Sequence, residues 1–206
     1  MSLLIDPVQI TPGMWLLPSF ASSAQLLPEI DQIISTAPLR QMQTQRGFTM
    51  SVAMTNCGEV GWTSDRRGYR YSETDPETGA KWPAMPVSLK NLATDAAKTV
   101  GFDGFEPDAC LINQYKPGAQ MGAHQDRNER SFEHPIVSVS LGITARFFVL
   151  GEENRGPSKS VDLNDGDVIV FGGEARRHFH GVRKLKASTH PIVGDTRWNL
   201  TFRVAQ

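Results

Sequence analysis

The second half of the chain consists of short β-like runs. From residue 108 onward, runs rich in Val, Ile, Phe and Thr alternate with Gly, Pro, Asn and Asp, as where Asn164, Asp165 and Gly166 precede the apolar run 168–171. About eight short strands in succession favour a sandwich, barrel or jelly roll over alternating βαβ units. The expected strands are 108–115, 136–141, 144–150, 160–163, 167–171, 178–182, 190–193 and 197–204.

Two segments in the first half have helical periodicity. In 22–36, an apolar stripe follows two serines that suit an N-cap, while Pro28 is expected to disturb or delay the first turn. In 86–100, a proline suits the first helical position and Gly101 follows as a stop signal. The expected fold class is therefore mainly β with flanking helices (α+β).

Length, charge and cysteine content exclude several protein classes. The 206 residues suit one domain, and they can bury a core without disulfides or a structural metal. Cys57 and Cys110 are far apart in the sequence and form no CxxC motif, which argues against a disulfide scaffold or a zinc knuckle. We expect no transmembrane helix and no signal peptide, and a cytoplasmic location. A net charge of −1 argues against a protein that coats nucleic acid, but it leaves room for a local basic groove.

Residues 40–72 interleave basic and aromatic side chains. Five arginines stand against Glu59 and Asp65, which gives this region a local balance of +3. Guanidinium groups next to aromatic rings suit phosphates and stacked bases. An ordinary two-stranded hairpin with a solvated face explains the same pattern, and taken alone this is the favoured interpretation.

The sequence His124-Gln-Asp126 indicates a metal site. In an extended segment, residues two apart lie on the same face, so His124 and Asp126 can reach one metal ion. A third ligand must come from elsewhere, and His178 and His180 on a later expected strand are both candidates. Two histidines and one carboxylate form the ligand set of non-haem Fe(II) oxygenases, although catalytic zinc also accepts this set.

The last expected strand has one polar and one apolar face. The polar face consists of Arg197, Asn199, Thr201 and Arg203. It contains no Lys, Glu or Asp, which is unusual for a solvated surface. Guanidinium forks suit carboxylate recognition, and Asn113 and Tyr115 repeat the polar pattern just before the metal motif. A dicarboxylate bound beside the metal explains both strands, and a solvated face is the alternative.

Several of these motifs occur together in the order found in one known family. They are Thr49–Gly58, Gly61-Trp62, Gly68-Tyr69, Pro107–Ala119, His124-Gln-Asp126, Pro135–Gly142, Gly166-Asp167, His180-Gly181 and Arg197–Arg203. From about residue 38 to its end, the chain resembles the bacterial AlkB family of Fe(II)/2-oxoglutarate dioxygenases, which repair N-alkylated bases. The resemblance implies one dioxygenase domain, 1–206, with a nucleotide-recognition lid at about 40–72. It also implies a jelly-roll (double-stranded β-helix) catalytic core at about 107–206.

The resemblance also implies roles for individual residues. The iron ligands, and thus the catalytic centre, would be His124, Asp126 and His180. The 2-oxoglutarate site would contain Asn113, Tyr115, Arg197, Asn199 and Arg203. Within it, Arg197 would bind the distal carboxylate, and Arg203 would also steady Asp126. The substrate base would stack on Trp62 against the His124 ring, and the further substrate contacts would be Tyr69, Met54, Thr44, Gln125 and Asn128.

Two positions depart from the family pattern. Where the pattern places a second acid two residues after Asp126, this chain has Asn128, whose amide is uncharged but both donates and accepts hydrogen bonds. This change leaves open the preference among methyladenine, methylcytosine and etheno adducts. Gln120 stands where a basic residue is expected near the phosphates.

The function implied by the resemblance is oxidative dealkylation of single- or double-stranded DNA, with RNA as a further candidate substrate. Fe(II), 2-oxoglutarate and O₂ would be required, and formaldehyde, succinate and CO₂ would be released. The enzyme is expected to be a monomer that needs no protein partner. One alternative keeps the chemistry and changes the substrate to tRNA, protein or a small molecule. The other is a non-catalytic nucleic-acid-binding module with a vestigial metal site.

Overall fold

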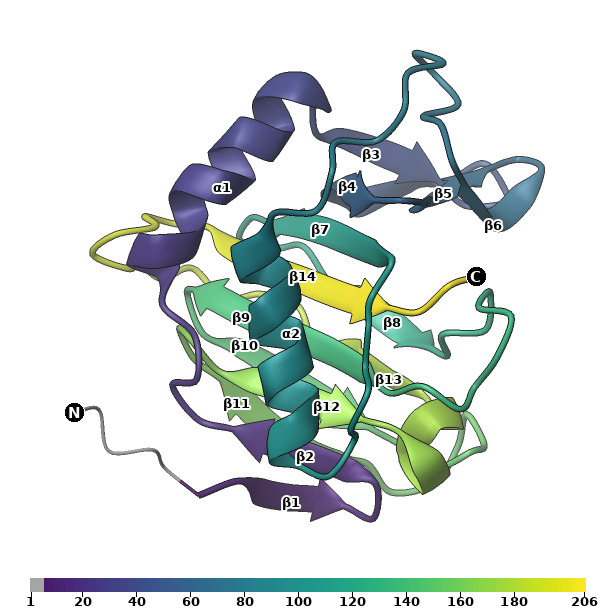
Figure 1. The fold of residues 1–206 in the computed structure, drawn as a ribbon. Coiled ribbons are helices and arrows are strands. Elements are labelled where there is room, and N and C mark those ends of the chain that lie inside the picture. Colours follow the sequence, from purple (N-terminus) through teal and green to yellow (C-terminus); the bar gives the residue numbers. More distant parts are fainter. Residues whose placement is uncertain (1–5) are drawn as a thin grey trace.

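Two antiparallel sheets face each other in the computed structural model, which describes residues 6–206 (Figure 1). The large sheet contains, in spatial order, β1 (Val8–Thr11), β2 (Met14–Leu17), β12 (Val168–Phe171), β9 (Ile136–Gly142), β14 (Arg197–Arg203), β7 (Ala109–Tyr115), β4 (Thr49–Gly58) and β3 (Arg40–Gln43). The small sheet contains β11 (Lys159–Leu163), β10 (Ala145–Val149), β13 (His180–Val182) and β8 (Met121–His124). This arrangement is the expected double-stranded β-helix, and the fold is mainly β.

Two helices cover the outer face of the large sheet, α1 (Ser23–Thr36) and α2 (Val87–Thr99) (Figure 1). Both lie where the periodicity predicts them. The expectation that Pro28 disturbs the first turn is wrong, because α1 begins at Ser23 and runs through Pro28. The serines do not cap the helix with their side chains: Ser22 makes no such bond, and the Ser23 hydroxyl donates to Asp165 at 3.1 Å.

The alternation of β14 divides its side chains between two cores. Trp198, Leu200 and Phe202 pack in the cluster that also contains buried residues of α1 and α2. The opposite side chains, Arg197 among them, point between the two sheets. All seven residues of β14 are buried. The polar face therefore lines an interior space, and the solvated-face alternative is wrong.

Some strand expectations fail. Residues 190–193 form a turn closed by a bridge between His190 and Gly194, and the His190 ring accepts hydrogen bonds from the backbone N–H groups of Ile192 and Val193. A side chain thus replaces the partner strand that this segment lacks. Strands β1, β2 and β8 form in segments for which no strand was expected. A short 3₁₀ helix, η1 (Gly173–Arg177), occupies the approach to β13.

Region 40–72 is more than a two-stranded hairpin. Strands β3 and β4 extend the large sheet, and β5 (Gly61–Asp65) pairs with β6 (Gly68–Ser72) in a separate hairpin that lies against β3, β4 and β7 (Figure 1). The favoured hairpin interpretation was therefore wrong for the region as a whole.

Among the described residues, no helix combines the length and apolar character needed to cross a membrane.

Candidate metal and cosubstrate site

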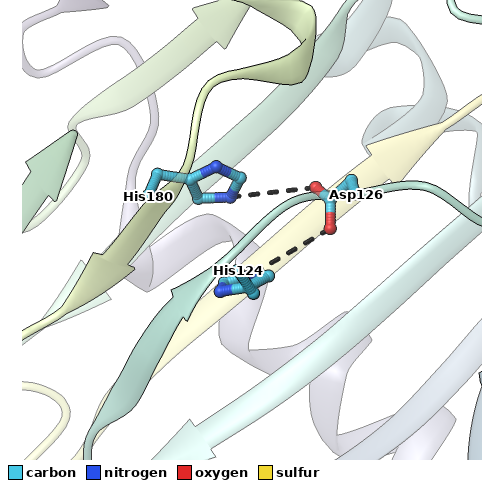
Figure 2. Close-up of side chains that lie close together, drawn as sticks. All are labelled: His124, Asp126 and His180. Atoms are coloured by element: carbon cyan, nitrogen blue, oxygen red, sulfur yellow. Dashed lines mark ion pairs between the residues drawn. The ribbon is translucent and has the colours of Figure 1, made fainter. Parts of the chain in front are cut away.

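Three metal-ligating side chains converge between the two sheets. His124 ends β8, Asp126 lies two residues further on, and His180 begins β13 as the register partner of His124. The His124 and His180 Nε2 atoms each lie 3.9 Å from a different oxygen of the Asp126 carboxylate (Figure 2). Three ligand atoms, one from each residue, lie within 4.8 Å of one another. Of the two histidines left open by the sequence, the geometry brings His180 into this cluster.

The imidazole rings are oriented by backbone carbonyls. The Nδ1 atoms of His124 and His180 lie 2.9 Å and 3.0 Å from the carbonyl oxygens of Gly122 and His178. A carbonyl only accepts hydrogen bonds, so each Nδ1 carries the proton and each Nε2 keeps its lone pair toward Asp126. The buried Oδ2 of Asp126 has no hydrogen-bond partner among the described residues. Two imidazole lone pairs and an unsatisfied carboxylate oxygen suit a divalent cation.

The protonation states also suit metal binding. Burial, with a further contribution from His124, lowers the pKa of His180 to about 4. Burial acts to raise the pKa of Asp126, but nearby positive charge, that of Arg203 above all, outweighs it and holds this pKa well below its usual range. At neutral pH, His180 is therefore a neutral imidazole and Asp126 a carboxylate, the forms that bind metals.

Beside this cluster lies a buried guanidinium without a counter-charge. Arg197 is 1% exposed, and its Nη2 donates to the Ser140 hydroxyl at 2.9 Å. Its Nε and Nη1 have no partner, and no carboxylate of the described residues forms an ion pair with it. Its Cζ lies 4.8 Å from the centre of the Tyr115 ring. A buried unpaired charge is costly, so this fork fits the carboxylate of a ligand.

One cavity joins the guanidinium to the metal-ligating cluster. Its polar lining includes Asn113, Tyr115, Ser138, Asn199 and Thr201, together with His124, Asp126, His180, Arg197 and Arg203. Every residue predicted for the metal and 2-oxoglutarate sites lies in this lining. The Asn113 amide donates to Asn199 Oδ1 at 3.3 Å, and the Asn199 amide donates to the Ser138 hydroxyl at 2.8 Å. These contacts hold the polar side chains in place around the cavity.

Two predicted substrate residues form an aromatic pair on the β5–β6 hairpin. The Trp62 and Tyr69 rings are stacked, with centroids 5.6 Å apart and planes 13° from parallel. Asn128 joins this pair to the segment after Asp126: its Oδ1 accepts from Trp62 Nε1 at 3.1 Å, and its Nδ2 donates to the Tyr69 carbonyl at 3.4 Å.

None of the six predicted substrate residues lines this cavity, and three of them have other surroundings. Met54 is 1% exposed and lies in an apolar cluster. The Thr44 hydroxyl accepts from the Phe48 N–H in the turn between β3 and β4, and the Gln125 amide donates to the Arg177 carbonyl. None of the three lines the cavity.

Comparisons with known proteins agree with this geometry. The family model of the 2OG-Fe(II) oxygenase superfamily matches residues 13–203. A solved structure of OsALKBH1 superposes with a TM-score of 0.83 at 29% identity, covering 96% of this chain and 99% of that one. The alpha-ketoglutarate-dependent dioxygenase AlkB of Escherichia coli K12 is 51% identical over 187 residues, which cover 91% of this chain and 87% of the relative.

The chain belongs to the AlkB family. It is an Fe(II)/2-oxoglutarate-dependent dioxygenase, so Fe(II), 2-oxoglutarate and O₂ are its cofactor and cosubstrates. A more distant relative from Arabidopsis thaliana, 32% identical over 170 residues, is named DNA N(6)-methyladenine demethylase ALKBH1C. It matches 70% of this chain and 37% of its own length. Relatives of this AlkB-family enzyme thus include one that acts on a nucleic acid.

The AlkB-family site has an outer layer of buried charged residues that the sequence did not indicate. Glu129 and Arg176 are buried and ion-paired with each other at 3.1 Å, directly behind the metal-ligating cluster. The only sequence signal is position, since Glu129 follows Asp126 by three residues and Arg176 precedes His180 by four. Charged residues at these positions look like surface residues until the fold buries them.

Proposed function

We propose that this AlkB-family enzyme oxidatively removes alkyl groups from ring nitrogens of damaged DNA bases, with 1-methyladenine and 3-methylcytosine as representative lesions. The observation that carries the proposal is the presence, in one buried cavity, of the His124–Asp126–His180 cluster and the uncompensated Arg197 guanidinium. The stacked Trp62–Tyr69 pair nearby supports a base as the substrate, because every base has a face that stacks on an aromatic ring.

The cavity residues divide into two proposed groups. His124, Asp126 and His180 hold Fe(II). Arg197 binds the distal carboxylate of 2-oxoglutarate, helped by Asn113 and Tyr115, while Asn199 and Arg203 lie toward the metal end. The bound iron, 2-oxoglutarate and O₂ supply the oxidation, in which one oxygen atom hydroxylates the alkyl carbon while 2-oxoglutarate becomes succinate and CO₂. The hydroxymethyl group then leaves the base as formaldehyde.

The protein contributes placement rather than the oxidising chemistry. Burial of β14 keeps bulk water away from the Arg197 guanidinium, and the carbonyl contacts at Nδ1 keep both imidazoles turned toward Asp126. Trp62 and Tyr69 hold the extruded base, and Asn128 contacts its exocyclic group. A damaged base is cheaper to unstack than a normal one, which favours lesions. Thr44, Met54 and Gln125 stay predictions for the substrate complex.

The organisation of the chain enters the same proposal. Residues 40–72 act as the nucleotide-recognition lid and residues 107–206 as the catalytic core, within one domain that works as a monomer without a protein partner. We assign the enzyme to the cytoplasm because both cysteines are free thiols, as expected in a reducing compartment.

The grip on the DNA backbone is expected to be weak. Three of the five lid arginines are already ion-paired, because Arg67 and Arg70 pair with Asp65 and Arg40 pairs with Asp75. Arg46 and Arg66 are exposed and remain for phosphates. Two such contacts on a single strand predict a slope of about −1.4 for the logarithm of the binding constant against that of the salt concentration.

The decisive experiment is a panel of modified oligonucleotides. Single-stranded and duplex DNA carrying 1-methyladenine, 3-methylcytosine or an etheno adduct, and matching RNA, are incubated with enzyme, Fe(II), 2-oxoglutarate and ascorbate. Mass spectrometry should show the unmodified base, with one formaldehyde and one succinate per methyl group removed. Turnover of RNA alone would move the substrate assignment to RNA. Absence of formaldehyde and succinate with every oligonucleotide would contradict the proposal.

A further inference from the structure

We propose that Glu129 is a positioning residue that links the β5–β6 hairpin to Asp126. The proposal rests on the proposed role of Asp126 as an iron ligand. It is carried by one juxtaposition: the same buried carboxylate contacts the hairpin on one side and, on the other, both guanidinium groups that hold Asp126.

The setting is a buried cluster of four charged side chains. Asp126 and Glu129 carry two negative charges, and Arg176 and Arg203 carry two positive charges, so the formal charges cancel. The side chain of Glu129 is 2% exposed. Removing one member of such a cluster leaves an uncompensated charge in the interior, so all four side chains have to be ordered together. Glu129 therefore cannot move independently of its neighbours.

Glu129 contacts both groups that hold Asp126. Arg203 Nη2 lies 3.0 Å from Asp126 Oδ1, and Arg203 Nε forms an ion pair with Glu129 Oε1 at 3.3 Å. Arg176 Nη1 donates to the Asp126 backbone carbonyl at 3.0 Å, and Arg176 Nη2 donates to Glu129 Oε2 at 3.1 Å. The side chain and the backbone of Asp126 are thus each held by an arginine that Glu129 holds in turn.

The hairpin reaches the same carboxylate through Tyr71. The Tyr71 hydroxyl of β6 donates to Glu129 Oε1 at 2.7 Å. Tyr71 is the register partner of Trp62, so the two side chains lie on the same face of the hairpin. When a base settles against Trp62, the position of Tyr71 is fixed as well. Through Glu129, the seating of the hairpin then fixes the carboxylate of Asp126, which couples base binding to productive oxidation.

The first test replaces Tyr71 by Phe, which removes the hydroxyl and keeps the ring. The readout is the number of formaldehyde molecules released per succinate with a 3-methylcytosine oligonucleotide, because this ratio reports coupling and not the total rate. We expect the ratio to fall about threefold or more. The matched control is Ser64→Ala, since the buried Ser64 hydroxyl also anchors the hairpin, to the Gln43 carbonyl at 2.5 Å, but has no contact with the charged cluster. The control should keep the wild-type ratio.

The second test replaces Glu129 by Gln and does not depend on turnover. Anaerobic titration of Fe(II) in the presence of 2-oxoglutarate is followed by the visible charge-transfer band. We expect about tenfold weaker Fe(II) binding and a shifted band, because outer partners of metal ligands affect affinity by 10- to 100-fold. Thermal unfolding checks that the variant folds. If it does not, the Tyr71→Phe comparison decides alone.

The outcomes separate this inference from the proposed function. A wild-type ratio in Tyr71→Phe, or a ratio lowered equally in Ser64→Ala, would overturn the link through Tyr71. Unchanged iron affinity and an unchanged band in a folded Glu129→Gln variant would overturn the link to Asp126. If the wild-type enzyme binds Fe(II) but demethylates no oligonucleotide, the proposed substrate fails, and the iron titration still tests Glu129.

Discussion

Strand β14 and the β5–β6 hairpin both carry site residues, but the fold holds them in different ways. β14 pairs with β7 on one side and β9 on the other, and all of its residues are buried. Within residues 6–206 the hairpin strands pair only with each other, and Tyr69 is 44% exposed. The residues proposed to bind 2-oxoglutarate therefore lie on β7 and β14, two strands inside the large sheet, whereas the aromatic residues proposed to select the substrate lie on a separate element. Substitutions in the cavity should affect cosubstrate binding and stability, and substitutions in the hairpin should affect substrate choice.

The largest effect is expected at the metal-ligating cluster. His124→Ala should abolish the charge-transfer band that appears when Fe(II) and 2-oxoglutarate are added anaerobically, and turnover should fall well beyond the roughly 100-fold that loss of an outer-shell partner causes. The His124 side chain is 39% exposed, so the variant should fold. Absorption spectroscopy and succinate release measure the two effects. A retained band would show that His124 is not a ligand.

Two arginines on the same face of β14 give a sharper contrast. Arg197→Met should raise the KM for 2-oxoglutarate about 100-fold, because a buried charge partner contributes about 2–5 kcal/mol. It should also stabilise the ligand-free protein by about 1–4 kcal/mol, because it removes a buried charge that has no counter-ion.

Arg203→Met is the matched control for this contrast. Arg203 is ion-paired with Asp126 and Glu129, so the same substitution should destabilise the ligand-free protein by about 3–5 kcal/mol. Urea unfolding measures both variants. If both substitutions changed the free energy of unfolding in the same direction, this would contradict the assignment of Arg197 as a guanidinium without a protein counter-charge that binds a ligand.

The pH dependence of stability tests the burial of His180. Its pKa is about 4 in the folded protein against 6.5 for the exposed group. At pH values between these two, the unfolded chain therefore binds more protons than the folded protein. The free energy of unfolding should therefore fall as the pH drops through 6.5 toward 4, by about 2 kcal/mol between pH 7 and pH 5. Asp126 has a lowered pKa, and its contribution is lost only at more acidic pH.

His180→Gln isolates this contribution. In metal-free protein, the variant should lack about 2 kcal/mol of the acid sensitivity of the wild type. Urea unfolding at the two pH values, with a chelator present, makes the comparison. Parallel pH profiles for the two proteins would show that His180 is not buried as a neutral ring.

The sequence predicted the parts of this molecule that repeat a local pattern. The two-residue alternation of β14 predicted its polar face, because side-chain direction in a strand depends only on sequence position. The spacing of His124 and Asp126 predicted a shared ligand face for the same reason. The helix 22–36 was predicted correctly despite Pro28, since packing against the sheet outweighs the backbone hydrogen bond that a proline cannot make.

Features that depend on distant partners could not be predicted in this way. β1 forms because β2 lies beside it, and β2 in turn pairs with β12, more than 150 residues away in the chain. Residues 190–193 resemble a strand but have no edge to join, and the His190 ring satisfies their N–H groups instead. The choice of His180 over His178 came only from the resemblance. The fold brings His180 to the metal-ligating cluster through strand register, because His180 is the cross-strand partner of His124.

A smaller effect is expected on the hairpin at Trp62. Trp62→Ala removes one stacking surface but leaves Tyr69, so turnover of a methylated oligonucleotide should fall about fivefold, at the lower end of what one stacked base contributes. Succinate formed without DNA should change far less, and the free energy of unfolding should change by less than about 1 kcal/mol. Equal losses in both assays would show that the hairpin is part of the oxidation machinery and would break the comparison with β14.

The smallest effect is expected at Asn128, where the hairpin meets the segment that carries Asp126. Asn128→Asp keeps an acceptor for the Trp62 indole but loses the donor to the Tyr69 carbonyl, and it adds a negative charge beside the base. Because 1-methyladenine is cationic and an etheno adduct of adenine is neutral, the charge should favour the methylated base by about two- to fivefold.

Competition between the two lesions in one reaction, scored by mass, measures the ratio directly. Asn128→Ala is the control, since it loses both hydrogen bonds without adding charge and should slow both lesions alike. An unchanged ratio in the Asp variant would place the exocyclic group of the base away from Asn128, and lesion choice would then depend on the aromatic pair alone.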